Sequence, residues 1–130
     1  AFAPDLVICA PDNDAARVAV CEQYHDSVPV VYTGLDMEAN GGYVFVHETQ
    51  NPCFQCFRPN PAGGGSCPQV PAVIDPTKLV AGLVLYAIDS LVMERPREWS
   101  AFEFHLSGIL PTKARAVEMS EKCPHHGDQI

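Results

Sequence analysis

Two pairs of metal-type side chains, far apart along the chain, constrain this fold most. Cys53-x-x-Cys56 has the spacing of a zinc knuckle, and Cys123-Pro-His-His126 is a second pair with its ligands three positions apart. If both pairs bind one tetrahedral ion, the last part of the chain must return to its middle. Four protein ligands leave no open coordination position, so we expect a structural rather than a catalytic Zn²⁺. The expected ligands are Cys53, Cys56, Cys123 and His126.

Two alternatives for these residues stay open. His125 could replace His126 as the fourth ligand, although only His126 preserves the Cys-x-x-ligand spacing. The pair Cys53 and Cys56 could also be free thiols or a redox motif. A redox pair usually opens a helix after a strand, whereas the neighbouring Asn51-Pro52 and Arg58-Pro59 predict a loop here.

Composition limits the class of protein. The 130 residues fit one domain, residues 1–130, and a hydrophobic fraction of 47% is enough for a core. A net charge of −8 argues against binding to nucleic acid or to anionic membranes, which favour an excess of Lys and Arg. There is no apolar run of membrane-spanning length, and the first residues do not resemble a signal peptide. We therefore expect a cytoplasmic protein whose cysteines are thiols or metal ligands.

Hydrophobic patterning predicts an α/β fold. The apolar runs Asp5–Ala10 and Val28–Gly34 are typical of buried parallel strands, and a helix with an apolar stripe is expected between them at 15–25. This is a βαβ unit with a right-handed crossover. Three further strands are expected at 41–48, 98–107 and 113–120, the last two paired through a turn at 108–111.

The segment from Thr77 to about Glu94 predicts a long helix that is apolar nearly all round. Such a helix is buried against a sheet or against another chain. Because 130 residues cannot cover all of its faces, we expect the chain to form a symmetric dimer.

These motifs, in this order, resemble a known family. DLVICAPDNDAAR, VPVVYTGLDMEANGGYVFV, CFQCFRP, SCPQVPAVIDPTKLVAGLVLYAIDSL and CPHHG are similar to successive segments of the ThiF/MoeB-like adenylating enzymes of the ubiquitin-activating superfamily. The resemblance covers Asp5 to Gly127 and only the C-terminal half of that Rossmann-like domain. The second knuckle departs from the family in having His where Cys is usual.

The resemblance implies an ATP-dependent enzyme that activates the C-terminus of a ubiquitin-like or sulfur-carrier protein. It also implies that Asp12 and Asn13 contact the nucleotide or its Mg²⁺, although capping of the following helix is the alternative for both residues. A structural ion pair is the favoured reading of Arg17. The chain has no G-x-G-x-x-G phosphate loop, so we expect it to be inactive without an N-terminal nucleotide-binding half.

Cys67 follows a glycine-rich stretch, at the place where the ThiF branch has the cysteine that bonds covalently to its protein partner. An accessible loop suits a reactive thiol, but a loop thiol without function is the alternative. As a whole, the sequence is interpreted as a fragment or truncated relative of such an adenylyltransferase. A non-catalytic, zinc-stabilised interaction module is the second interpretation, and a thiol redox protein is the third.

Overall fold

A mixed sheet lies at the centre of the structure, a computed structural model that describes residues 3–36, 40–59 and 74–127. Within these residues the sheet has five strands in the order β1-β2-β3-β4-β5. β1 and β2 are parallel, and every later neighbour is antiparallel. The strands are β1 (Val7–Cys9), β2 (Val30–Leu35), β3 (Gly41–His47), β4 (Ala101–His105) and β5 (Lys113–Arg115).

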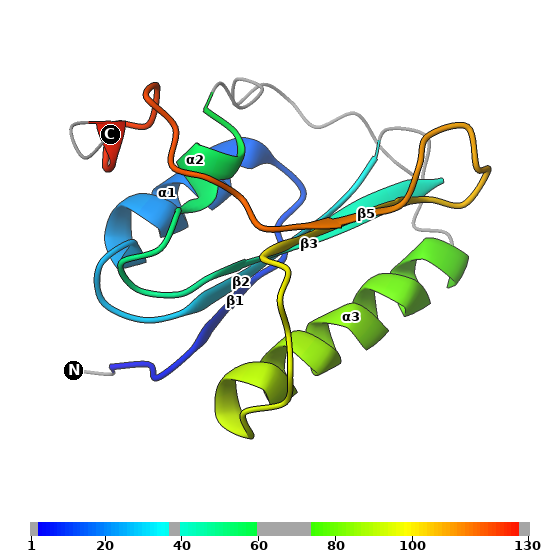
Figure 1. The fold of residues 1–130 in the computed structure, drawn as a ribbon, viewed down its shortest axis with the longest axis horizontal. Helices are drawn as coiled ribbons and strands as arrows, with labels where there is room; N and C mark the ends of the chain where they lie inside the picture. The colour runs from blue at the N-terminus through cyan, green and yellow to red at the C-terminus, as the bar shows by residue number, and fades with distance from the viewer. Residues whose placement is uncertain (1–2, 37–39, 60–73, 128–130) are drawn as a thin grey trace.

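Helices cover both faces of the sheet (Figure 1). Helix α1 (Asp14–Tyr24) connects the parallel strands β1 and β2, which confirms the predicted strand-helix-strand unit. The short helix α2 (Phe54–Phe57) and the C-terminal segment lie on the same face as α1, whereas α3 (Ile74–Val92) crosses the opposite face (Figure 1).

Strand β2 contributes to two separate cores because successive side chains point to opposite faces. Val30 and Tyr32 pack with α1 and α2. Val31 packs with Val44 of β3 beneath α3. Both faces are therefore apolar, which explains why β2 and β3 are hydrophobic along most of their length.

Two of the predicted boundaries that were wrong lie in α3 and in the last strand. Helix α3 begins at Ile74 rather than Thr77, because a proline in the first turn, Pro76, has no intrahelical hydrogen bond to lose there. The last strand ends at Arg115 rather than at residue 120. Beyond β5 the chain leaves the sheet, and its Met119 reaches Cys56, with 3.9 Å between the two sulfur atoms.

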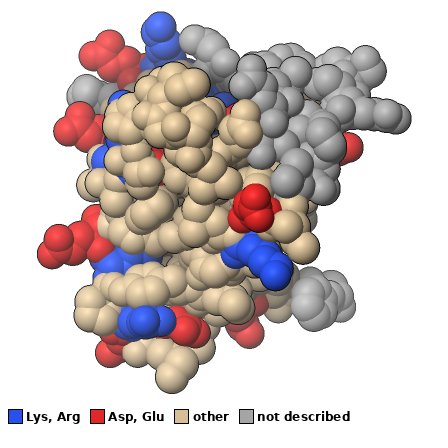
Figure 2. Space-filling model, turned by 90° about the vertical axis from the view of Figure 1, so that its right-hand side faces the viewer, with Lys and Arg blue, Asp and Glu red and all other residues tan. Residues whose placement is uncertain are grey.

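Charges of both signs are spread over the surface. Figure 2 shows acidic and basic side chains dispersed among uncharged residues on the face that it draws. Ion pairs among the described residues include Arg97 with Glu48 at 3.0 Å and Arg115 with Glu103 at 3.1 Å. Across the described residues, no helix has the length and apolar character needed to cross a membrane.

Candidate metal centre

The first ligand pair lies at the start of a helix, so its predicted placement in a loop was wrong. Cys53 is the N-cap of α2, and Cys56 is in the helix. The backbone N–H groups of Cys56 and Phe57 both donate to the Cys53 carbonyl, at 3.0 and 3.1 Å. This tight turn brings the two thiols to one side of the backbone.

Aromatic packing explains why these few residues form a helix between two prolines. Phe54 stacks on Tyr32 of β2, with 4.8 Å between ring centroids. Phe57 stacks on Phe45 of β3 at 4.9 Å, with only 4° between the ring planes. The two phenylalanines of α2 thus attach it to the sheet and fix the position of the cysteines between them.

The second ligand pair forms a similar turn near the end of the chain. The Gly127 N–H donates to the Cys123 carbonyl at 2.9 Å, which closes the turn around His126. Glycine is required at 127, since an added Cβ would lie 2.8 Å from the Glu121 carbonyl oxygen. The close approach of the two backbone segments therefore orients the second pair.

The two pairs meet in one buried cluster on the α2 face of the sheet. One ligand atom from each of Cys53, Cys56, Cys123 and His126 lies within 4.8 Å of all the others. Sγ of Cys53 and Sγ of Cys123 are 3.4 Å apart, too far for a disulfide bond of about 2.05 Å. Nδ1 of His126 is 3.3 Å from Sγ of Cys56 and 3.6 Å from Sγ of Cys123.

This geometry fits a tetrahedral ion. Zn–S bonds of about 2.3 Å place tetrahedral ligand atoms about 3.7 Å from one another, close to the separations in the cluster. All four residues are buried, and burial of three thiols and an imidazole is typical of structural zinc sites. The cluster could therefore hold a metal ion such as zinc through protein ligands alone.

Burial sets the protonation states of the metal-free site. It lowers the pKa of His126, so this ring is neutral and able to act as a ligand near pH 7. It raises the pKa of the Cys56 thiol. A hydrogen bond with Cys21 and burial together raise the pKa of Cys53. A bound cation would reverse this preference, since thiolates are the form that binds zinc.

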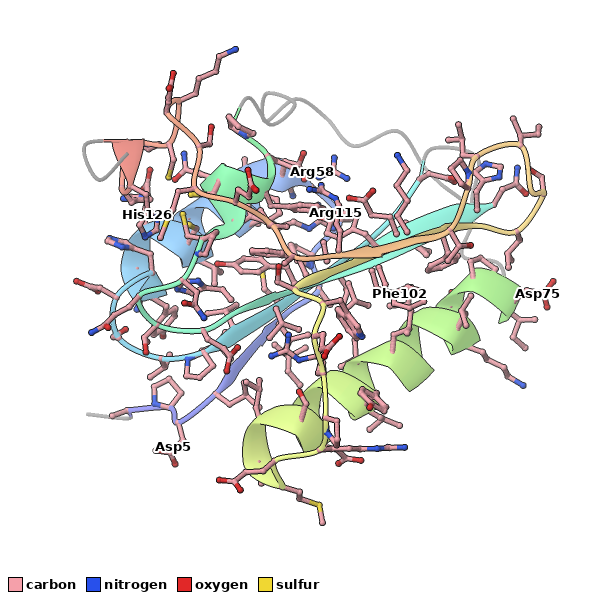
Figure 3. All side chains as sticks on the ribbon, viewed as in Figure 1. Asp5, Arg58, Asp75, Phe102, Arg115 and His126 are labelled. Carbon is pink, nitrogen blue, oxygen red and sulfur yellow. The ribbon has the colours of Figure 1, made fainter. Side chains whose placement is uncertain are left out.

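The two adjacent histidines have different roles. His126 belongs to the cluster, whereas His125 Nε2 hydrogen-bonds to Gln55 Oε1 at 2.8 Å. The His125 ring also stacks on His25 at the end of α1, with 4.0 Å between centroids. The structure thus favours His126 over His125 as the fourth ligand. Figure 3 shows the labelled His126 beside sulfur atoms near α2.

A buried histidine that was not predicted to belong to the site holds the backbone next to the first ligand pair. His47, at the end of β3, has no exposed surface. Its Nε2 lies 2.7 Å from the His25 carbonyl and its Nδ1 lies 3.1 Å from the Pro52 carbonyl. His47 therefore joins the end of α1 to the residue that precedes Cys53. A histidine at the end of an apolar strand, six residues before a knuckle, is the sequence signal for this role.

The residues predicted to contact a nucleotide lie at the other end of α1. Asn13 caps this helix, since its Oδ1 accepts from the Ala16 N–H at 2.8 Å, and its Nδ2 donates to Asp12 at 2.9 Å. Arg17 is buried and pairs with Asp14 at 2.8 Å, as the structural interpretation predicted. Arg17 also donates to the Thr33 carbonyl at 3.0 Å. Asp12 is exposed and follows β1.

Cys67, the predicted covalent residue, is outside the described residues. The described cysteines are all free: Cys9, Cys21, Cys53, Cys56 and Cys123.

Comparison with protein-family models gave no match, and comparison with curated proteins gave none either. The identified site is thus a buried Cys₃His cluster that joins the middle of an α/β domain to its C-terminal segment.

Proposed function

We propose that this chain is the zinc-stabilised C-terminal half of an enzyme that activates a ubiquitin-like or sulfur-carrier protein with ATP. The observation that carries the proposal is the closure of the Cys₃His cluster from two distant knuckles. A parallel β1–β2 pair and an antiparallel β2–β3 hairpin precede the first knuckle, in the order that the resemblance implies. The Rossmann-like character of the complete domain is part of this proposal.

Zinc would have a structural role in this protein. Cys53, Cys56, Cys123 and His126 would hold it, and the ion would supply the positive charge that keeps buried thiolates stable. The chain's own residues then hold the C-terminal segment against α2, as the Cys56–Met119 contact of 3.9 Å illustrates.

The proposed nucleotide contact rests on Asp12. It follows β1, the edge strand of the one parallel pair within the described sheet. Ligands of open α/β sheets bind outside the carboxyl ends of parallel strands, and an exposed carboxylate there suits Mg²⁺. Asn13 already uses both side-chain atoms in hydrogen bonds, so its contribution is to fix the start of α1 beside Asp12.

Direct binding tests this function. Calorimetric titration of the zinc-loaded chain with ubiquitin-like and sulfur-carrier proteins should give a saturable complex with one of them. The matched control is the same carrier without its C-terminal residues, which should bind at least about tenfold more weakly if that end is recognised. Absence of binding to every carrier would contradict the proposal.

Catalysis is the second half of the test. The chain alone should show no ATP–pyrophosphate exchange with the bound carrier, because it has no phosphate loop to stabilise the developing charge. Exchange should require a nucleotide-binding half supplied as a separate domain or by fusion. ATP–pyrophosphate exchange by the chain alone would contradict the proposal that nucleotide binding requires a separate N-terminal half.

A non-catalytic interaction module is the second candidate. The observation that favours it is the combination of a closed metal site with exposed apolar side chains on α3, such as Leu85 and Val92. A chain that binds a partner through α3 and gains no exchange activity from any nucleotide-binding half would support this candidate instead.

A further inference from the structure

Cations gather on the α2 face of the sheet, although the chain as a whole is acidic, with a net charge of −8. Arg58 follows α2, whereas Lys113 and Arg115 belong to β5, and all three residues are exposed. Figure 3 shows the labelled Arg58 and Arg115 near each other on this side of the sheet. Such a concentration of one charge on a chain of opposite net charge favours binding of an anionic partner there.

Strand register explains why the cations of β5 share a face with aromatic rings. In antiparallel strands, residues directly opposite each other point to the same face. Tyr43 pairs with Glu103, and Glu103 pairs with Lys113, so these three form one row across β3, β4 and β5. The next row on this face consists of Phe45, Ala101 and Arg115. The cations therefore lie at the outer end of a surface whose inner part is aromatic.

Aromatic rings hold two of the guanidinium groups in place. Cζ of Arg58 lies 4.5 Å from the centroid of the Tyr43 ring and 5.3 Å from that of Phe57. Cζ of Arg115 lies 5.5 Å from the centroid of the same Phe57 ring. A guanidinium that stacks on a ring keeps its N–H groups free in its own plane, where they match the two oxygens of a carboxylate. Arg58 and Arg115 are thus preorganised to bind anions.

The Tyr43 side chain under Arg58 has a polar group without a partner. A Cβ added to Gly34 would lie 2.6 Å from Cε1 of Tyr43, so the ring lies against the backbone of β2. The Tyr43 hydroxyl is buried and has no hydrogen-bond partner among the described residues. Burial raises the pKa of Tyr43 to about 12, so this hydroxyl keeps its proton and is a donor at neutral pH. Because few buried polar groups lack a partner, this feature points to an acceptor here independently of the charges.

Carboxylates neutralise only part of the positive charge on this surface. Glu103 is the one carboxylate in the two strand rows, and it pairs with Arg115 at 3.1 Å. Arg58 and Lys113 have no ion pair among the described residues. Cations on an edge strand also discourage aggregation, but that role does not explain Arg58, which is outside the sheet.

The occupant that fits this surface is an extended acidic peptide. β5 is the last strand of the described sheet, so none of the described strands pairs with its outer edge. An extended segment adds to such an edge through main-chain hydrogen bonds. Its side chains at alternate positions then share one face and lie about 7 Å apart, as those of Lys113 and Arg115 do. Inorganic phosphate would use the charges but not the edge.

We propose that this surface binds an acidic protein segment in extended conformation, with carboxylates at alternate positions bound by Arg58, Lys113 and Arg115. The surface lies on the α2 face, opposite the exposed apolar residues of α3. Binding of such a segment requires neither ATP nor a carrier protein, so its test is independent of the enzymatic function proposed above.

Fluorescence anisotropy of a labelled, end-blocked peptide with the core Glu-Val-Glu, titrated with the zinc-loaded chain, should show saturable binding. The same residues in the order Glu-Glu-Val place the carboxylates on opposite faces of an extended segment. This peptide should bind at least about tenfold more weakly, because it loses a charge-assisted hydrogen bond. Absence of binding, equal binding of the two peptides, or displacement by an equal concentration of inorganic phosphate would overturn the proposal.

Substitution of the arginines tests the assigned residues. Arg58→Ala and Arg115→Ala should each raise the dissociation constant at least about tenfold. Arg58→Lys should lose most of the same affinity, because lysine keeps the charge but not the planar group. Arg95→Ala is the matched control, since Arg95 is an exposed arginine that stacks on Tyr86 of α3 at 4.1 Å. It should change the affinity by less than about twofold, and a loss as large as that of Arg58→Ala would reduce binding to net charge and exclude the site.

A gain of binding separates the site from an effect on folding. Glu103→Gln removes the carboxylate that competes for Arg115 and should lower the dissociation constant about two- to fivefold, as expected for an exposed ion pair. Lys113→Ala changes an exposed strand residue and should weaken binding by a similar factor. Circular dichroism and zinc content should match wild type in both variants. Unchanged or weaker binding by Glu103→Gln would contradict the role of Arg115, even if Arg58 variants lost zinc.

Discussion

Nδ1 of His126 lies 3.3 Å from Sγ of Cys56, although 70 residues separate them in the sequence. This contact connects the turn that follows β3 with the C-terminal segment. If zinc occupies the cluster, its binding free energy, about 10–16 kcal/mol in zinc-finger peptides, stabilises this long-range closure. Metal binding and the position of the C-terminal segment should therefore depend on each other.

The first prediction is a metal content of one Zn²⁺ per chain. Cys56→Ser should reduce this to well below one equivalent and increase hydrogen exchange in the C-terminal segment, because three ligands bind zinc far more weakly. Cys9→Ser is the matched control, since Cys9 is a buried cysteine outside the cluster. Native mass spectrometry measures the metal content, and hydrogen-exchange mass spectrometry measures the protection of the C-terminal segment. A folded, metal-replete wild-type chain without zinc would contradict the prediction.

The adjacent histidines provide the second prediction. His126→Ala should weaken zinc binding by more than about 100-fold, since even loss of an outer-shell partner costs 10–100-fold. His126→Cys should retain zinc with four thiolates. His125→Ala should have a much smaller effect, because His125 bonds Gln55 rather than the cluster. Competition with a chelator measures the affinities, and equal losses for both alanine variants would mean that the ligand is misassigned.

The third prediction concerns pH. Burial raises the pKa of Cys56 above the ordinary thiol value of 9.0, so near pH 7 its proton must leave when zinc binds. Burial lowers the pKa of His126 below 6.5, so this ring is neutral at pH 7 and releases none. Zinc affinity should therefore fall continuously as the pH is lowered from 9 to 6.5, through thiol protonation alone.

Chelator competition across this range, together with calorimetry in buffers of different ionisation enthalpy, measures the protons released. Protonation of His126 should add to the loss only below pH 6.5. An affinity that is constant between pH 9 and 6.5 would contradict thiolate ligation.

The fourth prediction separates the cap of α1 from the metal centre. Asn13→Ala removes the acceptor of the Ala16 N–H and should lower the free energy of unfolding by about 1 kcal/mol. Asn13→Ser should retain most of this energy, because serine also caps helices. Zinc content should be unchanged in both variants. Chemical denaturation measures the difference, and an Asn13→Ala variant as stable as Asn13→Ser would argue against the cap.

Alkylation tests the prediction for Cys67. In the zinc-loaded chain Cys67 should react with iodoacetamide first, whereas Cys53 and Cys56 should be protected as buried ligands. Peptide mapping after limited labelling identifies the site. Labelling of Cys53 or Cys56 before Cys67 would contradict both assignments. In the complete enzyme, normal transfer by a Cys67→Ser variant would exclude a covalent role.

The sequence predicted the four clustered residues because ligand spacing is a local property that survives folding. It did not predict helix α2, since the prolines around the knuckle indicate a loop and only the sheet supplies the rings on which Phe54 and Phe57 stack. It also overextended the last strand. The alternating pattern continues beyond Arg115, but the contact of Met119 with Cys56 draws the chain away from the sheet.

The distance between the knuckles along the chain also has a consequence for biosynthesis. A ribosome that adds about 5–20 residues per second makes the Cys56 knuckle several seconds before His126 exists. During that interval the nascent chain offers two thiols as an incomplete site, open to chaperones or to competing metals. The complete ligand set can therefore form only after translation has passed residue 126. In prematurely terminated chains the C-terminal segment would not bind to the first knuckle, and these chains would be accessible to proteases.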